Sequence, residues 1–368
     1  MAEIEKKNEL PEEVETEEVD VEVETDQEEV PAEEPVEDFY RNLAEDMDER
    51  ALGRMSSQLI QDYKKDKVSR GDWEQAYTQG LDLLGFKYVN NTRPFQGASG
   101  VTHPLLSEAV TQFQAQAYKE LLPSDGPVRT QVVGAQTKEV EDQATRVKDF
   151  MNYMLMEEME EYTPDTDQLL FYLPLAGSAF KKVYYDGQLG RAVSKFVSGE
   201  DLVIDYFAAD LETASRVTHC IKMNGNELRK NQVSGFYRDV EVSSGSVDTS
   251  EVKEKVNELD GVEPSYAGDD DEHLILEMHC DLDIPGFEDE NGIKLPYIVT
   301  IDKDSEEVLS IRRNFDQIDS ARKKKQYFVH YKFLPGLGFY GFGLIHMLGG
   351  LSRTATSVLR QLIDAGTL

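Results

Sequence analysis

The stretch that decides the fold is residues 327–368, YFVHYKFLPGLGFYGFGLIHMLGGLSRTATSVLRQLIDAGTL. Its first five residues, 327–331, form a short apolar run that predicts a β-strand. A glycine-rich corner follows at 335–343, and a long helical pattern begins at Leu344. The stretch therefore predicts a strand that turns sharply into a helix, and the apolar face of that helix needs a surface to pack against.

The apolar residues of this helix recur at spacings of four and three, which is the pattern of an a/d seam. Ile345, Leu359 and Ile363 widen the seam to a full buried face, and Ala365–Gly366 predicts the end of the helix. Since no partner element follows, we expect either a polypeptide truncated at its C-terminus or a subunit that packs against other chains. The residues expected to contact other subunits are Leu344, Leu348, Leu351, Ala355, Val358 and Leu362.

The corner also matches the G-x-G-x-x-G pattern of dinucleotide-binding loops over residues 336–341. Bulky Phe339 and Tyr340 occupy positions usually kept clear beside a pyrophosphate, and no alternating β-α-β pattern surrounds the motif. We therefore predict a structural corner, no cofactor and no enzymatic activity. The glycines of this corner are Gly336, Gly338, Gly341 and Gly343.

Composition and charge restrict the function classes. The chain has 368 residues, 39% of them hydrophobic, and a formal net charge of -34. Residues 1–38 hold eighteen acidic residues against two lysines, so we expect a disordered acidic tail. The charge argues against a protein that grips nucleic acid by neutralising phosphates. No apolar run is long enough to predict a membrane span.

Helical spacing predicts helices between Phe39 and Gly85, the first with Leu52, Leu59 and Ile60 on its apolar face. Alternation predicts short strands at 179–185, 192–197, 202–204, 217–223, 274–282, 297–301 and 308–311. The order of these elements indicates the α+β class, with a helical N-terminal half, a β-rich meander in the second half and a long C-terminal helix. Within the helical part we also expect a strand at Val128–Val133, an N-cap at Thr102, and a Met-rich helix end, Met151–Met159, in the core. The predicted portions are a tail at 1–38, a helical portion at 39–187, a β-rich portion at 188–331 with a mobile acidic excursion at 243–272, and the corner with its helix at 332–368.

Two further motifs are candidates for binding sites, one for a metal ion and one for an anionic partner. His219–Cys220 and His279–Cys280 resemble metal half-sites, but neighbouring side chains of a strand point to opposite faces, so we predict no metal site. The strongest basic run is a candidate contact for phosphate or for an acidic partner, although a solvated loop is the simpler interpretation. That run consists of Arg322, Lys323, Lys324 and Lys325.

Three stretches, taken in order, resemble the portal protein of tailed bacteriophages: Ala98–Leu106, Leu173–Tyr185, and the corner from Gly338 with its helix to Gly366. The resemblance covers roughly residues 40–368 and leaves out the acidic tail. It implies a wing-like fold and a ring, usually of twelve subunits, at one capsid vertex.

The resemblance further implies a conduit for packaging and ejection of double-stranded DNA, without catalysis by this chain. The implied partners are other copies of the chain, terminase, the major capsid and scaffolding proteins, and a tail or neck adaptor. The implied location is the virion, after assembly in the host cytoplasm. Two alternatives stay open: another phage head–neck structural protein, and a nucleotide-binding enzyme that uses the Gly336–Gly341 corner.

Overall fold

The computed structural model describes residues 36–86, 95, 98–187, 189–243, 251–260 and 272–367. Helices and strands are both abundant and α9 is long, which confirms the α+β class and the C-terminal helix. The helices are α1 (Val36–Phe39), α2 (Glu49–Ser69), α3 (Gly71–Leu81), α4 (Leu105–Leu121), α5 (Lys138–Tyr153), α6 (Tyr162–Ala176), α7 (Gly225–Val233), α8 (Glu251–Asp260) and α9 (Leu344–Thr367), with short turns η1 (Leu43–Glu45), η2 (Asp82–Leu84) and η3 (Met154–Glu158).

The eight described strands lie close to their predicted positions. Alternating apolar and polar residues, rich in Val, Ile, Phe and Tyr, account for them. They are β1 (Ser178–Asp186), β2 (Arg191–Val197), β3 (Leu202–Val203), β4 (Arg216–Asn224), β5 (Glu272–Leu282), β6 (Leu295–Asp302), β7 (Val308–Arg313) and β8 (Phe328–Lys332).

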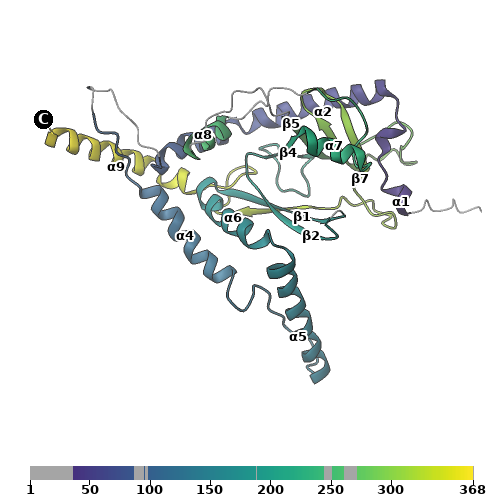
Figure 1. The fold of residues 1–368 in the computed structure, drawn as a ribbon, viewed down its shortest axis with the longest axis horizontal. Helices are drawn as coiled ribbons and strands as arrows, with labels where there is room; N and C mark the ends of the chain where they lie inside the picture. The colour runs from purple at the N-terminus through teal and green to yellow at the C-terminus, as the bar shows by residue number, and fades with distance from the viewer. Residues whose placement is uncertain are drawn as a thin grey trace, which may run out of the picture.

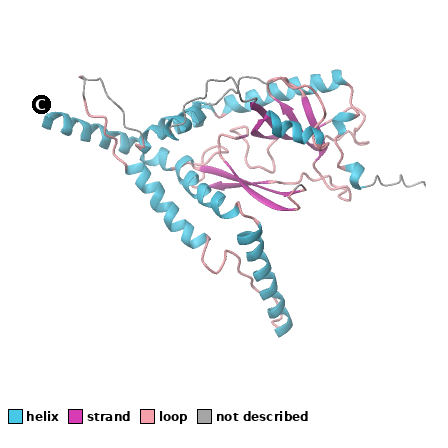
Figure 2. Cartoon of the chain, viewed as in Figure 1, coloured by secondary structure: helices cyan, strands magenta, loops and turns pink. Residues whose placement is uncertain are grey.

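The strands form two separate antiparallel sheets (Figure 2). The five-stranded sheet has the order β3-β4-β5-β6-β7 and is called the meander sheet below. The three-stranded sheet, the small sheet, has the order β2-β1-β8. The predicted continuous meander is therefore wrong at its last strand, because β8 pairs with β1, with Ala179 opposite Tyr331. The alternation of apolar and polar residues predicts which side chains share a face of a strand, but it does not predict which strand pairs with it.

One face of the meander sheet packs under α2 (Figure 1). On β5 the even-numbered residues, such as Leu276 and Met278, enter this core with Leu59 and Ile60 of α2. The odd-numbered residues of β5 point the other way: Ile275 packs with α7 residues, while the strand's later part faces the small sheet. The meander sheet is thus the middle layer of the protein.

A second core joins α3, α4 and α6 to the small sheet and the glycine corner. It includes Trp73, Leu106, Phe180 and Phe339. The first core draws on α2 and the meander sheet, so each core takes residues from both sides of the predicted boundary at residue 187.

The predicted helices from Phe39 to Gly85 are confirmed, with Gly85 in the left-handed region that ends the last turn. The segment Val128–Val133 is not a strand, because its polar groups bond to one helix and not to a neighbouring strand. Asn152 accepts from the Val128 amide (2.8 Å) and donates to its carbonyl (3.2 Å). Pro104, not Thr102, occupies the N-cap position of α4.

The prediction of a mobile acidic excursion at 243–272 needs correction. Of the excursion at 243–272, residues 244–250 and 261–271 lie outside the described residues, but 251–260 form α8. Val252 is buried against the second core and Lys255 pairs with Asp82 at 2.7 Å, so this part is a docked helix. Of the predicted tail at 1–38, residues 1–35 lie outside the described residues, whereas Val36–Phe39 form the short helix α1.

Candidate functional site: the glycine corner and the final helix

The corner between β8 and α9 is built by close approach of backbone to backbone. A Cβ on Gly341 would lie under 3.0 Å from the carbonyl oxygens of Gly177 and Leu334, and one on Gly343 would meet the carbonyl of Leu175. Gly177 ends α6 with φ of 88°. Glycine is needed here because the chain leaving α6 and the chain entering α9 touch without room for side chains.

Hydrogen bonds fix this contact. The amide of Gly341 donates to Ser178 Oγ (2.8 Å), and the amide of Phe339 donates to the Tyr206 carbonyl (2.8 Å). The amide of Phe342 donates to Leu334 across an isolated bridge (2.9 Å). Phe339 is itself fully buried, so its ring fills the space that a dinucleotide loop leaves open for phosphates.

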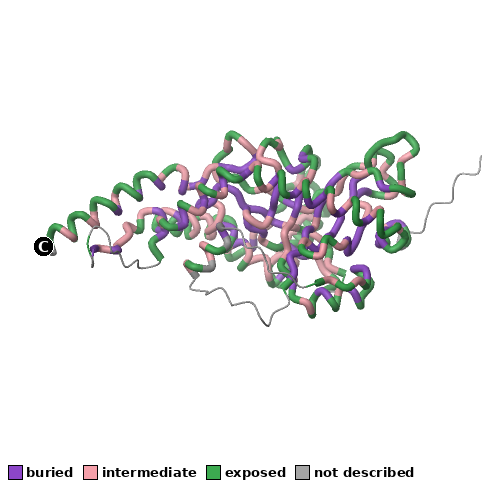
Figure 3. The backbone as a smooth tube through the Cα atoms, turned by 90° about the horizontal axis from the view of Figure 1, so that it is seen from above, coloured by how far each residue is buried: buried purple, intermediate pink, exposed green. Residues whose placement is uncertain are grey.

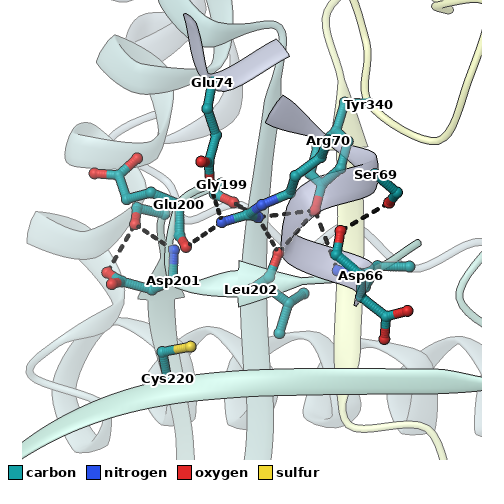
Figure 4. Close-up of polar contacts among 12 residues, drawn as sticks. Asp66, Ser69, Arg70, Glu74, Gly199, Glu200, Asp201, Leu202, Cys220 and Tyr340 are labelled. Atoms are coloured by element: carbon teal, nitrogen blue, oxygen red, sulfur yellow. Dashed lines mark hydrogen bonds and ion pairs between the residues drawn. The ribbon is translucent and has the colours of Figure 1, made fainter. Parts of the chain in front are cut away.

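A buried arginine ties the corner to the helical body. Arg70, just after α2, is 1% exposed and donates to the carbonyl oxygens of Gly199 (2.8 Å), Glu200 (2.7 Å) and Leu202 (2.9 Å) (Figure 4). It also donates to Tyr340 Oη at 2.9 Å. One guanidinium thus joins α2, the loop before β3 and the corner.

The charge on Arg70 is balanced within the same cluster. Its Nη2 lies 2.7 Å from a carboxylate oxygen of Glu74, and its guanidinium lies 5.7 Å from the centroid of the Trp73 ring. Burial alone would lower the pKa of Arg70, but the Tyr340 oxygen and the Glu74 carboxylate raise it, so the guanidinium stays charged. Burial raises the pKa of Tyr340, which remains a neutral donor.

Within the chain, the final helix α9 packs mainly with a face other than the seam that we expect to contact other subunits. Its buried side consists mainly of small or polar residues, because the chain packs closely beside it. In the predicted seam, Leu351 is 61% exposed, Val358 50% and Leu362 66%. Figure 3 shows much of this helix, which leads to the C-terminus, in the colour of exposed residues. Leu344, Leu348 and Ala355 are half-buried. The predicted end at Gly366 is wrong, since the helix continues to Thr367. The residues buried on α9 are Ile345, Gly349, Ser352 and Thr356.

The polar edge of α9 holds an extended segment of the chain. The amide of His103 donates to Thr356 Oγ1 (3.0 Å), and the amide of Ser99 donates to Asp364 Oδ1 (2.8 Å). Arg360 Nε donates to the carbonyl of Val101 at 2.7 Å. With the contact between Gly177 and the corner, the structure brings together all three stretches on which the portal resemblance rests.

A second exposed apolar face lies on α5, which projects away from both sheets (Figure 1). No residue of α5 is buried, and Phe150 is 62% exposed and Met151 43%. The prediction that the Met-rich end fills the core is therefore wrong for most of that segment, although Met159 is buried. The spacing of apolar residues identifies a helix face that packs against another surface. It does not indicate whether that surface belongs to the same chain or to another one.

The basic run is largely engaged inside the protein. Lys324 Nζ donates to the Ala214 carbonyl (3.2 Å), Lys325 Nζ donates to Tyr40 Oη (3.0 Å), and Arg322 lies over the Phe315 ring. These groups anchor the loop before β8. Lys323 alone of the four is exposed, so the run does not form a continuous basic patch.

The two histidine–cysteine pairs are separated by strand alternation, as predicted. His219 and His279 face the small sheet, while Cys220 contacts Tyr63 of α2 and Cys280 is in the core under α2. Burial raises the pKa of Cys280 to about 12, which disfavours a thiolate ligand. Among the described residues, no three potential metal ligands come together.

The layer between the sheets contains one ion pair that the sequence did not single out. Lys182 of β1 lies 2.6 Å from a carboxylate oxygen of Glu277 of β5, and His279 Nε2 lies 2.8 Å from the same carboxylate. Burial would raise the pKa of Glu277, but Lys182 and the His279 hydrogen bond lower it, so it is ionised. This pair joins the two sheets.

Replacing Lys182 by methionine is expected to lower the free energy of unfolding by about 2–3 kcal/mol, because Glu277 would keep a charge in a nearly dry layer. Replacing both Lys182 and Glu277 by methionine should recover most of that loss. Urea unfolding at fixed protein concentration measures both variants. A double variant that is no more stable than Lys182→Met would contradict this account.

No helix in the described part of the chain is long and apolar enough to cross a membrane. No protein-family model matches the sequence, and no curated protein is significantly similar to it.

Proposed function

We propose that this chain is a portal protein that forms a ring, a conduit for double-stranded DNA and a platform for terminase and neck proteins. The observation that carries the proposal is the seam of α9. Leu351, Val358 and Leu362 follow heptad spacing, yet they are exposed in the single chain. An apolar stripe of this kind is typical of a helix that packs against another subunit.

Two further features support the proposal. The corner fixes the direction in which α9 begins. Its glycines contact the end of α6, and Arg70 holds Tyr340 of the corner. The chain carries a net charge of -34, and a negative channel wall lets phosphates pass without holding them. Phe339 and Tyr340 are buried in the corner, at positions that a dinucleotide-binding loop keeps clear beside the pyrophosphate, which favours the structural interpretation of the corner.

The ring is tested by light scattering after size exclusion and by negative-stain images of the full chain. At micromolar concentration we expect a particle many times the mass of one chain, with a central channel. A monomer under these conditions would contradict the proposal.

Replacing Leu351, Val358 and Leu362 together by glutamine is expected to abolish or strongly reduce assembly. These side chains are exposed and glutamine favours helices, so each substitution should change monomer stability by less than about 0.5 kcal/mol. The matched control replaces three exposed apolar residues on other elements, Val68, Val233 and Ile318, by glutamine. Equal loss of assembly in both triple variants would show that α9 has no special role.

A further inference from the structure

Four of the six histidines contact one continuous unit of the chain. This unit, called the corner unit, comprises β8, the glycine corner and the first turn of α9, residues 328–346. Two of the four lie in the unit itself and two pack against its first residue, Phe328. They are His219 and His279 (5.6 and 5.2 Å from the Phe328 ring centroid), His330 in β8, and His346 in α9.

The His330 ring packs against two phenylalanine rings, whose own centroids lie 6.1 Å apart. The centroids of Phe180 and Phe339 lie 4.4 and 4.6 Å from its own, and its Nε2 is 3.0 Å from Ser178 Oγ. Burial, with Lys332 nearby, lowers the pKa of His330 to about 3. The two phenylalanine rings would offset part of the free-energy cost of a positive charge on His330. The cavity of about 590 Å³ beside it is also lined by Asp210, Glu212, Lys324 and Lys332.

His346 depends on an unprotonated ring nitrogen. Its Nδ1 accepts a hydrogen bond from the amide of Gly343 at 3.0 Å, and its ring contacts Phe342. Burial lowers the pKa of His346. A proton on Nδ1 would set one N–H against another, so the bond that begins α9 would be lost.

His219 and His279 lie beside the ion pair of Lys182 and Glu277. Burial and Lys182 lower the pKa of His219 to about 4, against the opposing effect of Glu277 and Asp201. Burial also lowers the pKa of His279; Glu277 opposes this effect, whereas Lys182 and Lys324 reinforce it. Protonation would add positive charge next to Lys182 in the layer between the sheets.

We propose that the corner unit is an acid-operated latch: uncharged histidines hold it against the rest of the chain, and their protonation releases residues 328–346 while the meander sheet stays folded. The core under α2 contains none of these four histidines. The remaining histidine of β5, His273, lies 3.5 Å from the buried Asp302 carboxylate within the meander sheet.

The direction of the pH dependence follows from the number of protons that the attached and released states bind. Each of these histidines has a lowered pKa in the folded state, so the released state binds more protons once the pH falls below about 6.5. Attachment of the corner unit is therefore complete near neutral pH and weakens as the pH falls from about 6.5 towards 4. A histidine that is neutral while the corner unit is attached and charged after release changes the equilibrium constant for release about tenfold per pH unit.

Hydrogen–deuterium exchange of the full chain tests the latch at about pH 7 and about pH 5, after correction for intrinsic exchange rates. We expect protection of residues 328–346 to fall at least about tenfold relative to residues 295–302 on acidification. Loss of protection at the same pH in both segments would overturn the proposal, because it would indicate global unfolding.

Two variants give independent readouts. His346→Asn keeps an acceptor for the Gly343 amide but cannot titrate, and Lys332→Met removes the charge that disfavours a proton on His330. Both should retain more protection of 328–346 at about pH 5 than the wild type, whereas the control His103→Asn should not. An acid response unchanged in both variants would overturn the latch, and if one fails to fold, the other decides.

Discussion

Replacing Arg70 by methionine is expected to lower the free energy of unfolding by about 3–5 kcal/mol. The loss of stability would come from buried polar groups that no longer have a partner. The carbonyl oxygens of Gly199, Glu200 and Leu202 would lose their donor in a buried site, and Glu74 would keep an unbalanced charge. Methionine fits the volume but donates no hydrogen bond, so the loss reports polar pairing and not a cavity.

The measurement is urea unfolding followed by circular dichroism at fixed protein concentration, since assembly would make stability depend on concentration. The matched control is Arg50→Met, which changes an exposed arginine near the start of α2. If Arg70→Met and Arg50→Met differ by less than about 1 kcal/mol, the Arg70 cluster does not hold the corner in the way described.

Replacing Gly343 by alanine is expected to cost at least about 3 kcal/mol, or to prevent soluble expression. The added methyl group would collide with the carbonyl of Leu175 and the amide of Gly177, and neither is a side chain that can rotate away. Relief would require α6 and the corner to separate, which would pull Gly341 from Ser178.

Gly350 provides a control of opposite sign within the same helix. A Cβ at Gly350 would meet nothing within 4 Å, so Gly350→Ala should stabilise α9 by about 0.5–1 kcal/mol through helix propensity. Thermal unfolding of both variants at one protein concentration gives the comparison. Equal effects of the two substitutions would show that the corner tolerates a side chain.

Local structure was largely predictable from sequence. The spacing of Leu52, Leu59 and Ile60 predicted α2, and alternation placed β4 and β5 within two residues of their ends. The same alternation separated His219 from Cys220. These patterns succeed because each depends on neighbours within a few residues along the chain.

Long-range structure was not predictable in the same way. Phe150 and Met151 of α5 have the spacing of core residues, yet they are exposed, because periodicity describes a face and not its cover. Apolar periodicity also gave no signal for the side of α9 that packs within the chain, where Ser352 and Thr356 are buried. Arg70 gave no signal, since an arginine near the end of a helix is common and usually solvated.

The pairing of β8 with β1 also bears on how the chain folds. The meander sheet is made of strands adjacent in sequence, whereas Ala179 meets Tyr331 only after the whole meander has been synthesised. Closing such a long loop is slow relative to forming hairpins. We therefore expect the meander to fold first, while one edge of β1 stays open until β8 arrives. During that interval the open edge is the part of the chain most exposed to mispairing with another copy.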